Sequence, residues 1–146
     1  MNPKHIGFEI RTISNLIKRD FEHSKPAELD CSKGVHGWAI RFFFENQDKD
    51  IFQKDFETRF SIRRSTATNI LKLMEKNGLI IRIPSKNDAR LKKITLTEKA
   101  INIHNCISKD IIEREKRLAQ NISAEELDIF FSVCEKIKKN LEENNV

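Results

Sequence analysis

The sequence predicts a mainly α-helical protein of the α+β class with one small β-hairpin. Apolar residues recur every three or four positions in long segments near both ends of the chain, and two β-type runs flank a polar segment near its middle. Only four Gly and three Pro occur among 146 residues, which favours a helical chain over a loop-rich one. A chain of this length fits a single domain, residues 1–146, with a core of its own.

The composition argues against several classes of protein. No apolar run reaches the roughly 18 residues of a membrane span, and the N-terminus, MNPKHIGFEI, lacks the apolar core of a signal peptide. We therefore expect a cytoplasmic protein with no membrane partner. Cys31, Cys106 and Cys134 lie far apart without metal-ligand spacing, so we expect neither a metal site nor a cofactor.

The first predicted helix lies within residues 1–24. Its apolar residues are spaced by three or four positions and form one stripe: Ile6, Ile10, Ile13, Ile17 and Phe21. This stripe must pack either on the core of the same chain or on a second subunit. After a polar connection, VHGWAIRFFFEN predicts a short apolar helix that carries the only Trp, Trp38.

Two further helices are predicted between Ile51 and Lys76. The segment Ile51 to Phe60 has apolar residues on one face and suits the first helix of a helix-turn-helix. In the helix that follows Ser61 and Ile62, one face is apolar, formed by Ala67, Ile70, Leu71 and Met74. The opposite face is short, polar and basic, with no acidic residue before Glu75.

The hairpin follows directly. Asn77-Gly78 is suited to a left-handed helix cap. The runs Leu79 to Ile83 and Leu91 to Leu96 then predict two strands around the polar tip PSKNDAR. Residues 98–143 predict two long striped helices, the second opened by a capping box of Ser123 and Glu126. Three long striped helices exceed what this core can bury, so we expect residues 1–24 and 98–143 to form a dimerisation region.

Positive charge is concentrated in the middle of the chain. Between Lys54 and Lys93 there are eleven Lys/Arg and four Asp/Glu, a local charge of +7, which leaves −2 for the other residues. Such a concentration is typical of a module that binds a polyanion, although charge alone fits a solvated basic face equally well. We interpret residues 34–100 as a winged helix-turn-helix that docks on duplex DNA.

The candidate DNA contacts fall in two groups. A helix with short polar residues in its first half can reach base edges in the major groove, and cations at its entrance can reach phosphates. The residues in this first group are Arg63, Arg64, Ser65, Thr66, Thr68, Asn69 and Lys72. The hairpin tip brings Lys86 and Arg90 to the adjacent minor groove, and Asp88 either orients Arg90 or is an ordinary turn residue.

The stretch SIRRSTATNILKLMEKNGLIIR, followed by NDAR and ITLTEKA, resembles the MarR family of winged-helix transcriptional regulators. The resemblance implies a homodimer that binds a pseudo-palindromic operator, usually as a repressor, and is released by a small molecule or an oxidant. It also implies that Thr68 is a recognition-helix residue and that Arg90, supported by Asp88, enters the minor groove. Asn69 stands where many members have Arg, and Phe56 where many have Leu.

A candidate effector pocket follows from the same resemblance, because the helix with His36, Trp38 and Phe44 often borders one in the family; simple packing is the alternative. Cys31 precedes a helix and a lysine, which favour the thiolate, so it is a candidate redox residue or a plain cysteine.

Two rival functions remain. No catalytic or phosphate-loop spacing surrounds the His and Cys residues, so we do not expect an enzyme. A winged helix that binds RNA or a protein partner is the other alternative to a sequence-specific, double-stranded DNA-binding regulator.

Overall fold

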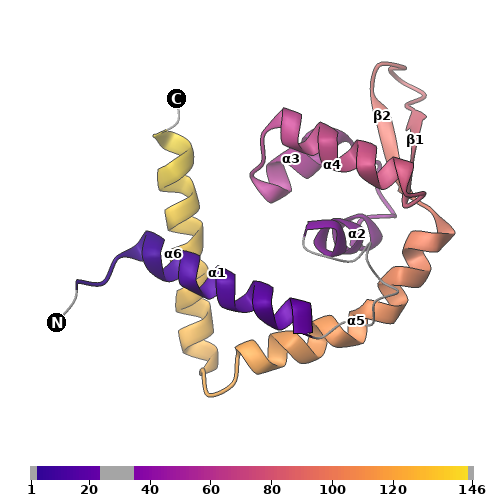
Figure 1. Cartoon of the computed structure of the whole chain (residues 1–146). Coiled ribbons are helices and arrows are strands. Elements are labelled where there is room, and N and C mark those ends of the chain that lie inside the picture. The colour runs from indigo at the N-terminus through magenta and orange to yellow at the C-terminus, as the bar shows by residue number, and fades with distance from the viewer. Residues whose placement is uncertain (1–2, 24–34, 145–146) are drawn as a thin grey trace. The chain divides into compact units, whose positions relative to one another are not determined.

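The order of the elements confirms a mainly helical fold with one hairpin. The structure is a computed structural model that describes residues 3–23 and 35–144, and in this part the chain forms the elements shown in Figure 1. The helices are α1 (Ile6–His23), α2 (Val35–Glu45), α3 (Gln53–Phe60), α4 (Arg64–Lys76), α5 (Glu98–Leu118) and α6 (Ala124–Glu143). The strands β1 (Ile80–Pro84) and β2 (Lys92–Leu96) lie between α4 and α5.

Two compact units make up the chain, residues 1–107 and residues 108–146, and the boundary falls inside α5. The first unit contains the predicted helix-turn-helix and the hairpin. The second contains the end of α5 and the whole of α6. No helix in the described ranges is both long and apolar enough to cross a membrane.

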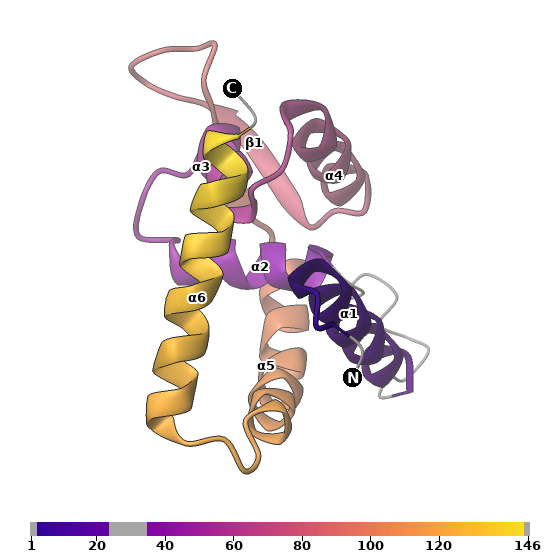
Figure 2. The same ribbon diagram turned by 90° about the vertical axis from the view of Figure 1, so that its left-hand side faces the viewer.

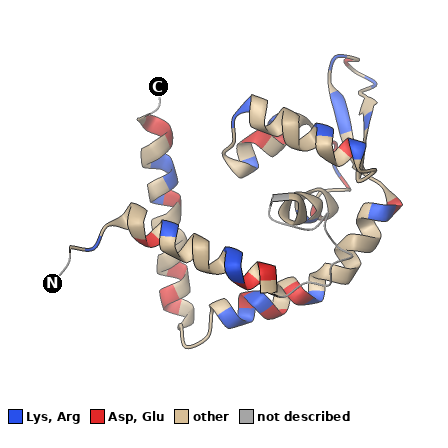
Figure 3. Ribbon diagram, in the orientation of Figure 1, with Lys and Arg blue, Asp and Glu red and all other residues tan. Residues whose placement is uncertain are grey.

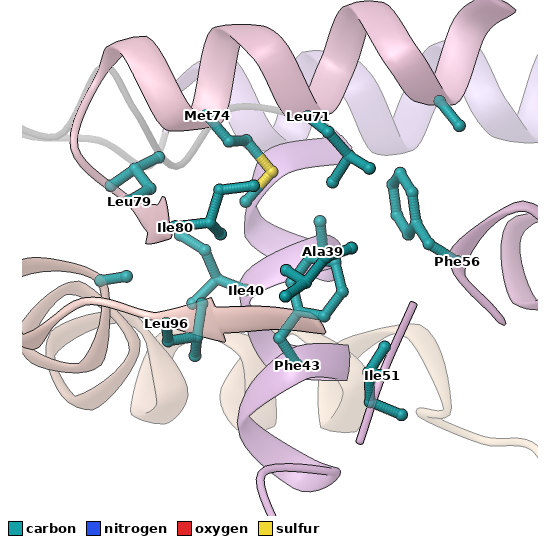
Figure 4. Packing of buried hydrophobic residues seen from close by; sticks show 13 residues of the cluster. Ala39, Ile40, Phe43, Ile51, Phe56, Leu71, Met74, Leu79, Ile80 and Leu96 are labelled. Carbon is teal, nitrogen blue, oxygen red and sulfur yellow. The ribbon is translucent and has the colours of Figure 1, made fainter. Parts of the chain in front are cut away.

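One hydrophobic cluster holds α2, α3, α4 and the hairpin together. Figure 4 shows Leu71 and Met74 of α4 pointing toward Ala39 and Ile40 of α2, and all four are fully buried. Phe56 is also fully buried, and the centroid of its ring lies 5.5 Å from that of Phe43. The predicted inner face of α4 is therefore confirmed.

The turn between α3 and α4 contains a strained residue. Ser61 has a φ of 49°, in the left-handed region that few residues other than glycine adopt readily. Its N–H donates to the carbonyl of Thr58, and the N–H of Ile62 donates to the carbonyl of Glu57. These bonds close the end of α3 and set the direction in which α4 begins.

Helix α3 begins two residues later than the sequence predicts. The Asp55 carboxylate accepts a hydrogen bond of 2.9 Å from the N–H of Phe52, which is half of a capping box, whereas Phe52 has no side-chain acceptor to supply the other half. At the far end of α4, Gly78 has a φ of 70°. The predicted left-handed cap is confirmed there.

The hairpin has the predicted form with both strands starting one residue later. β1 and β2 are antiparallel, with Ile80 opposite Leu96 and Pro84 opposite Lys92. Ile80, Ile94 and Leu96 are buried on the core side, whereas Ile81 and Ile83 lie exposed on the other side. In two views the loop that joins the strands extends beyond α3 and α4 (Figures 1 and 2).

In the second unit, α6 begins with the capping box that the sequence predicts. The Ser123 hydroxyl accepts from the N–H of Glu126, and the Glu126 carboxylate accepts from the N–H of Ser123. No side chain of α6 is buried in the single chain. The exposed large apolar side chains of α6 are Ile129, Phe130, Phe131, Val133 and Leu141.

Candidate nucleic-acid interface

The outer face of α4 is open to solvent while its inner face is held by the core. Ser65, Thr66, Asn69 and Lys72 are exposed, and in the described part of the chain the first three make no side-chain hydrogen bond. Thr68 is half-buried at the edge of this face. The helix thus presents free hydrogen-bonding groups without depending on them for its own packing.

The N-terminus of α4 combines an uncapped helix end with two cations. Arg63 is the N-cap residue, has an extended backbone, and provides no side-chain hydrogen bond to the first turn. Backbone N–H groups of that turn therefore remain available, and the helix dipole places partial positive charge there. With the exposed guanidinium groups of Arg63 and Arg64, this end of α4 favours an anion such as a phosphate.

The hairpin tip is organised by Asp88. Its carboxylate accepts hydrogen bonds from the backbone N–H of Arg90 at 3.0 Å and from Arg90 Nε at 3.3 Å. The Arg90 side chain is nonetheless 91% exposed. Asp88 thus fixes the base of the Arg90 side chain and leaves the rest of the guanidinium open to a ligand. Lys86 is also exposed, and Figure 3 shows the blue of Lys and Arg along the hairpin.

Besides the shared hydrophobic cluster, polar contacts join the two strands of the hairpin to the rest of the first unit. Arg82 Nε of β1 donates to Glu75 Oε2 of α4 at 2.6 Å. In β2, Lys93 pairs with Asp50 at 2.7 Å, and the N–H of Ile94 donates to the carbonyl of Ile51 at 2.8 Å. The helix and the hairpin that carry the two groups of candidate DNA contacts therefore belong to one compact unit.

One residue that contacts the recognition face was missed by sequence reasoning. Gln53, the first residue of α3, donates from Nε2 to the Thr68 hydroxyl at 2.9 Å and to the carbonyl of Arg64 at 3.4 Å. These partners lie eleven and fifteen residues away in the sequence. No periodicity or motif signals such a contact, because it depends on how the two helices cross.

The candidate effector residues on α2 differ in their surroundings. Trp38 is 43% exposed, whereas His36 is half-buried and burial lowers the pKa of its imidazole. At about 100° per residue, Trp38 lies about 160° around the helix from His36, so these two side chains do not share a face. Cys31, the candidate redox residue, lies outside the described residues.

Phe44 has a partner that the sequence did not reveal. Its ring stacks on the imidazole of His104 from α5, with centroids 3.9 Å apart and planes 19° from parallel. His104 is 8% exposed, and its Nδ1 has no hydrogen-bond partner within the described part of the chain. Burial and the nearby Arg41 guanidinium lower the pKa of His104, while the Glu45 carboxylate opposes them.

Comparisons with known proteins agree with this geometry. The model of the MarR family matches residues 46–92, from the loop before α3 to the start of β2. A curated relative, an uncharacterized HTH-type transcriptional regulator from Bacillus subtilis named YybA, is 20% identical over 139 residues, covering 95% of this chain and 87% of the relative.

Solved structures show the same fold. The MepR–DNA complex of S. aureus superposes with a TM-score of 0.82 at 22% identity, covering 94% of this chain and 96% of that one. The heme sensor PefR from Streptococcus agalactiae in complex with heme superposes with a TM-score of 0.64 at 26% identity, covering 94% and 95%.

Proposed function

We propose that this chain is a MarR-family winged helix-turn-helix transcriptional regulator, and that it binds specific sites on double-stranded DNA and represses transcription there. Such family members are regulators of transcription and not enzymes. The observation that carries the proposal is the pairing of an exposed polar face on α4 with a braced, basic hairpin. MepR, which shares the fold, forms a complex with DNA.

In this proposal α4 enters the major groove. Its inner face packs in the core and its outer face carries neutral hydrogen-bonding groups, the combination needed for contact with base edges. Asn69 can bond an adenine through two hydrogen bonds, while Arg63 and Arg64 bond phosphates around the uncapped helix end. Ser65, Thr66, Thr68 and Lys72 complete the proposed contacts.

The hairpin tip enters the adjacent minor groove. Arg90 is the side chain that enters the groove, because it is exposed and oriented by its hydrogen bonds with Asp88. Lys86 adds a second cation at the tip. A narrow minor groove has an enhanced negative potential that attracts such an arginine. Binding through these cations releases counterions, so the affinity is expected to fall steeply with salt.

The DNA-bound form is proposed to be a homodimer on a pseudo-palindromic operator. Neither α1 nor α6 buries a single side chain within one chain, although both carry large apolar residues. An exposed apolar stripe of this kind marks a protein interface. If two copies join through residues 1–24 and 98–143, the interface sets the spacing between their two winged helix-turn-helix regions.

Release from DNA is proposed to follow a small-molecule or oxidant signal. PefR is described as a heme sensor, which is a precedent for a small effector on this fold. His36, Trp38 and Phe44 are the candidate pocket residues, and Cys31 is the candidate redox residue. Titration of compounds while the fluorescence of Trp38 is followed tests the pocket. The exchange Cys31→Ser should abolish peroxide-dependent release if Cys31 is the sensor.

Selection of bound duplexes from a random pool tests the central claim. We expect an enriched motif with two half-sites about one helical turn apart. A gel-shift competition between the selected duplex and a structured RNA then separates DNA from RNA recognition. Preference for the RNA, or the absence of any enriched motif, would contradict the proposal.

A further inference from the structure

The inference concerns Gln53, which lies outside the proposed DNA contacts but touches one of them. Its side-chain amide donates to Thr68 Oγ1 at 2.9 Å and to the carbonyl of Arg64 at 3.4 Å. Both acceptors lie on one side of the first turns of α4. Gln53 begins α3, and the Thr68 bond is partly buried, so the contact links the two helices of the motif.

A threonine hydroxyl in a helix ordinarily donates its proton to a carbonyl one turn earlier. Thr12 of α1 behaves in this way, donating to the carbonyl of Glu9 at 3.0 Å. For Thr68 the carbonyl one turn earlier is that of Arg64, and Gln53 already donates to it. No acceptor for the Thr68 proton is present among residues 3–23 and 35–144.

We propose that Gln53 is a positioning residue that makes Thr68 an outward hydrogen-bond donor to DNA. By donating to Oγ1 and to the Arg64 carbonyl, Gln53 fixes Thr68 Oγ1 as an acceptor on the protein side. The single hydroxyl proton is then directed away from the helix. Its partner is an acceptor on the duplex, either a base-edge atom such as purine N7 or thymine O4, or a phosphate oxygen.

This inference rests on the proposed DNA binding and deepens it. Gln53 acts through Thr68 and carries no charge, so its loss should leave the salt dependence of binding unchanged. Its effect should also disappear once the Thr68 hydroxyl is absent. A residue that only stabilises the fold would instead weaken binding to every duplex and lower the melting temperature to match.

A double-mutant cycle on the selected duplex tests the coupling. The variants are Gln53→Met, which keeps the length of the side chain without its donors, and Thr68→Val, which removes the hydroxyl and keeps the shape. We expect each single variant to raise Kd about tenfold, as for the loss of one contact of this kind. The double variant should bind no more than about twofold more weakly than Thr68→Val, because both changes remove the same contact.

Gln47→Met is the matched control, since it makes the same exchange in the exposed loop before α3. Melting temperatures and Kd on an unrelated duplex are measured for every variant. Independent, multiplying effects in the double variant would overturn the proposal. An equal loss on the selected and unrelated duplexes would also overturn it and assign Gln53 a structural role.

Reversal of the bond gives a second test. In Gln53→Glu the carboxylate accepts the Thr68 proton, so the donor no longer faces DNA. The added negative charge also weakens DNA binding directly, and this direct loss of affinity is the same in a Thr68→Val background. We expect the loss from Gln53→Glu to be several-fold larger with Thr68 present than with Thr68→Val. Equal losses in the two backgrounds would contradict the proposal.

Modified duplexes identify the acceptor. Single 7-deazapurine or 4-thiothymine substitutions test base edges, and single methylphosphonate substitutions test phosphates. At one modified position of the duplex, the unmodified protein should bind more weakly than it binds the unmodified duplex. The Thr68→Val variant should bind both duplexes equally well. No such site would overturn the inference even if the protein binds DNA. Failure of the unmodified protein to bind any selected duplex would overturn the proposed function and this inference together.

Discussion

At the scale of single residues, the structure separates side chains that hold the fold from those left open for a ligand. Arg90 shows the second case. It is 91% exposed, and its pairing with Asp88 is too solvated to contribute much to stability. The pair instead restricts the directions in which the guanidinium can point, which lowers the entropic cost of binding.

The exchange Arg90→Ala is expected to weaken binding to the selected duplex several-fold. The slope of log Kd against log salt should fall by about one unit, because one phosphate-neutralising cation is lost. Gel shifts or fluorescence anisotropy at several salt concentrations measure both effects. Lys138→Ala in α6 removes one positive charge outside the basic region and is the control. An unchanged affinity for Arg90→Ala would remove the hairpin from the mechanism.

His104 is expected to make folding stability depend on pH. In the unfolded chain it takes up a proton near pH 6.5, whereas burial and Arg41 lower its pKa in the folded chain. The unfolded state therefore binds more protons as the pH falls below 6.5, so the free energy of unfolding falls over that range. Above 6.5 both states are neutral at this site and its contribution is constant.

The variant His104→Phe keeps a ring against Phe44 and removes the titrating group. Urea unfolding on both sides of pH 6.5 should show a smaller loss of stability on acidification than in the unchanged protein. Some loss should remain, since burial also lowers the pKa of His36. Identical pH profiles for the two proteins would show that His104 does not couple to folding.

At the scale of the elements, the ends of α3 and α4 depart from ordinary helix chemistry. Ser, Thr, Asp and Asn are the preferred N-cap residues, but Phe52 and Arg63 occupy these positions. At the start of α4, the N-cap residue Arg63 brings a positive charge but no side-chain hydrogen bond that would cap the helix. We interpret this as stability given up for affinity to phosphate.

Arg63→Ser should therefore move stability and DNA binding in opposite directions. A serine at this position can accept from the first turn of α4, which is expected to raise the free energy of unfolding by about 1 kcal/mol. Loss of the guanidinium should weaken DNA binding several-fold and lower the salt slope. Arg64→Ser is the matched control because it removes the same charge one residue inside the helix, with no cap gained. Equal stability of the two variants would contradict the capping argument.

The elements were more predictable than the contacts between them. The apolar periodicity of α4, Asn77-Gly78 at its end and the polar tip between two β-type runs are local signals, so helix and hairpin could be predicted to within a residue or two. Stacking of Phe44 on His104 joins positions sixty residues apart and depends on helix packing. The start of α3 was displaced because its capping signal is carried by Asp55 rather than by the N-cap residue.

At the scale of the whole molecule, the basic region and the two helices that bury no side chain are different elements, although Ile81 and Ile83 also lie exposed on the hairpin. The local charge of +7 between Lys54 and Lys93 coincides with α3, α4 and the hairpin. Large exposed apolar residues are carried by α1 and α6, which have no buried side chains of their own. The polyanion and the second copy of the chain are thus expected to contact different elements.

Phe131→Glu is expected to disrupt the proposed dimer without unfolding the chain. Phe131 is 58% exposed, so the new carboxylate places a charge on the apolar face of α6 and does not enter a core. Sedimentation should show a shift from dimer to monomer, with a large loss of affinity for a two-half-site duplex. Ser132→Glu adds the same charge to the other side of α6 and is the control. A dimeric Phe131→Glu variant would exclude this face from the interface.

The C-terminal end of α4 is held through its backbone. Thr97 donates to the carbonyl of Gly78, Lys99 donates to the carbonyl of Asn77, and the inner face of the helix supplies the rest of its support. Ser65, Thr66 and Asn69 take no part in that support. Substitutions at these positions can therefore accumulate in a lineage without threatening folding, and paralogues can diverge in the DNA they recognise. Thr68 is the exception, because an exchange there also requires a compatible residue at position 53.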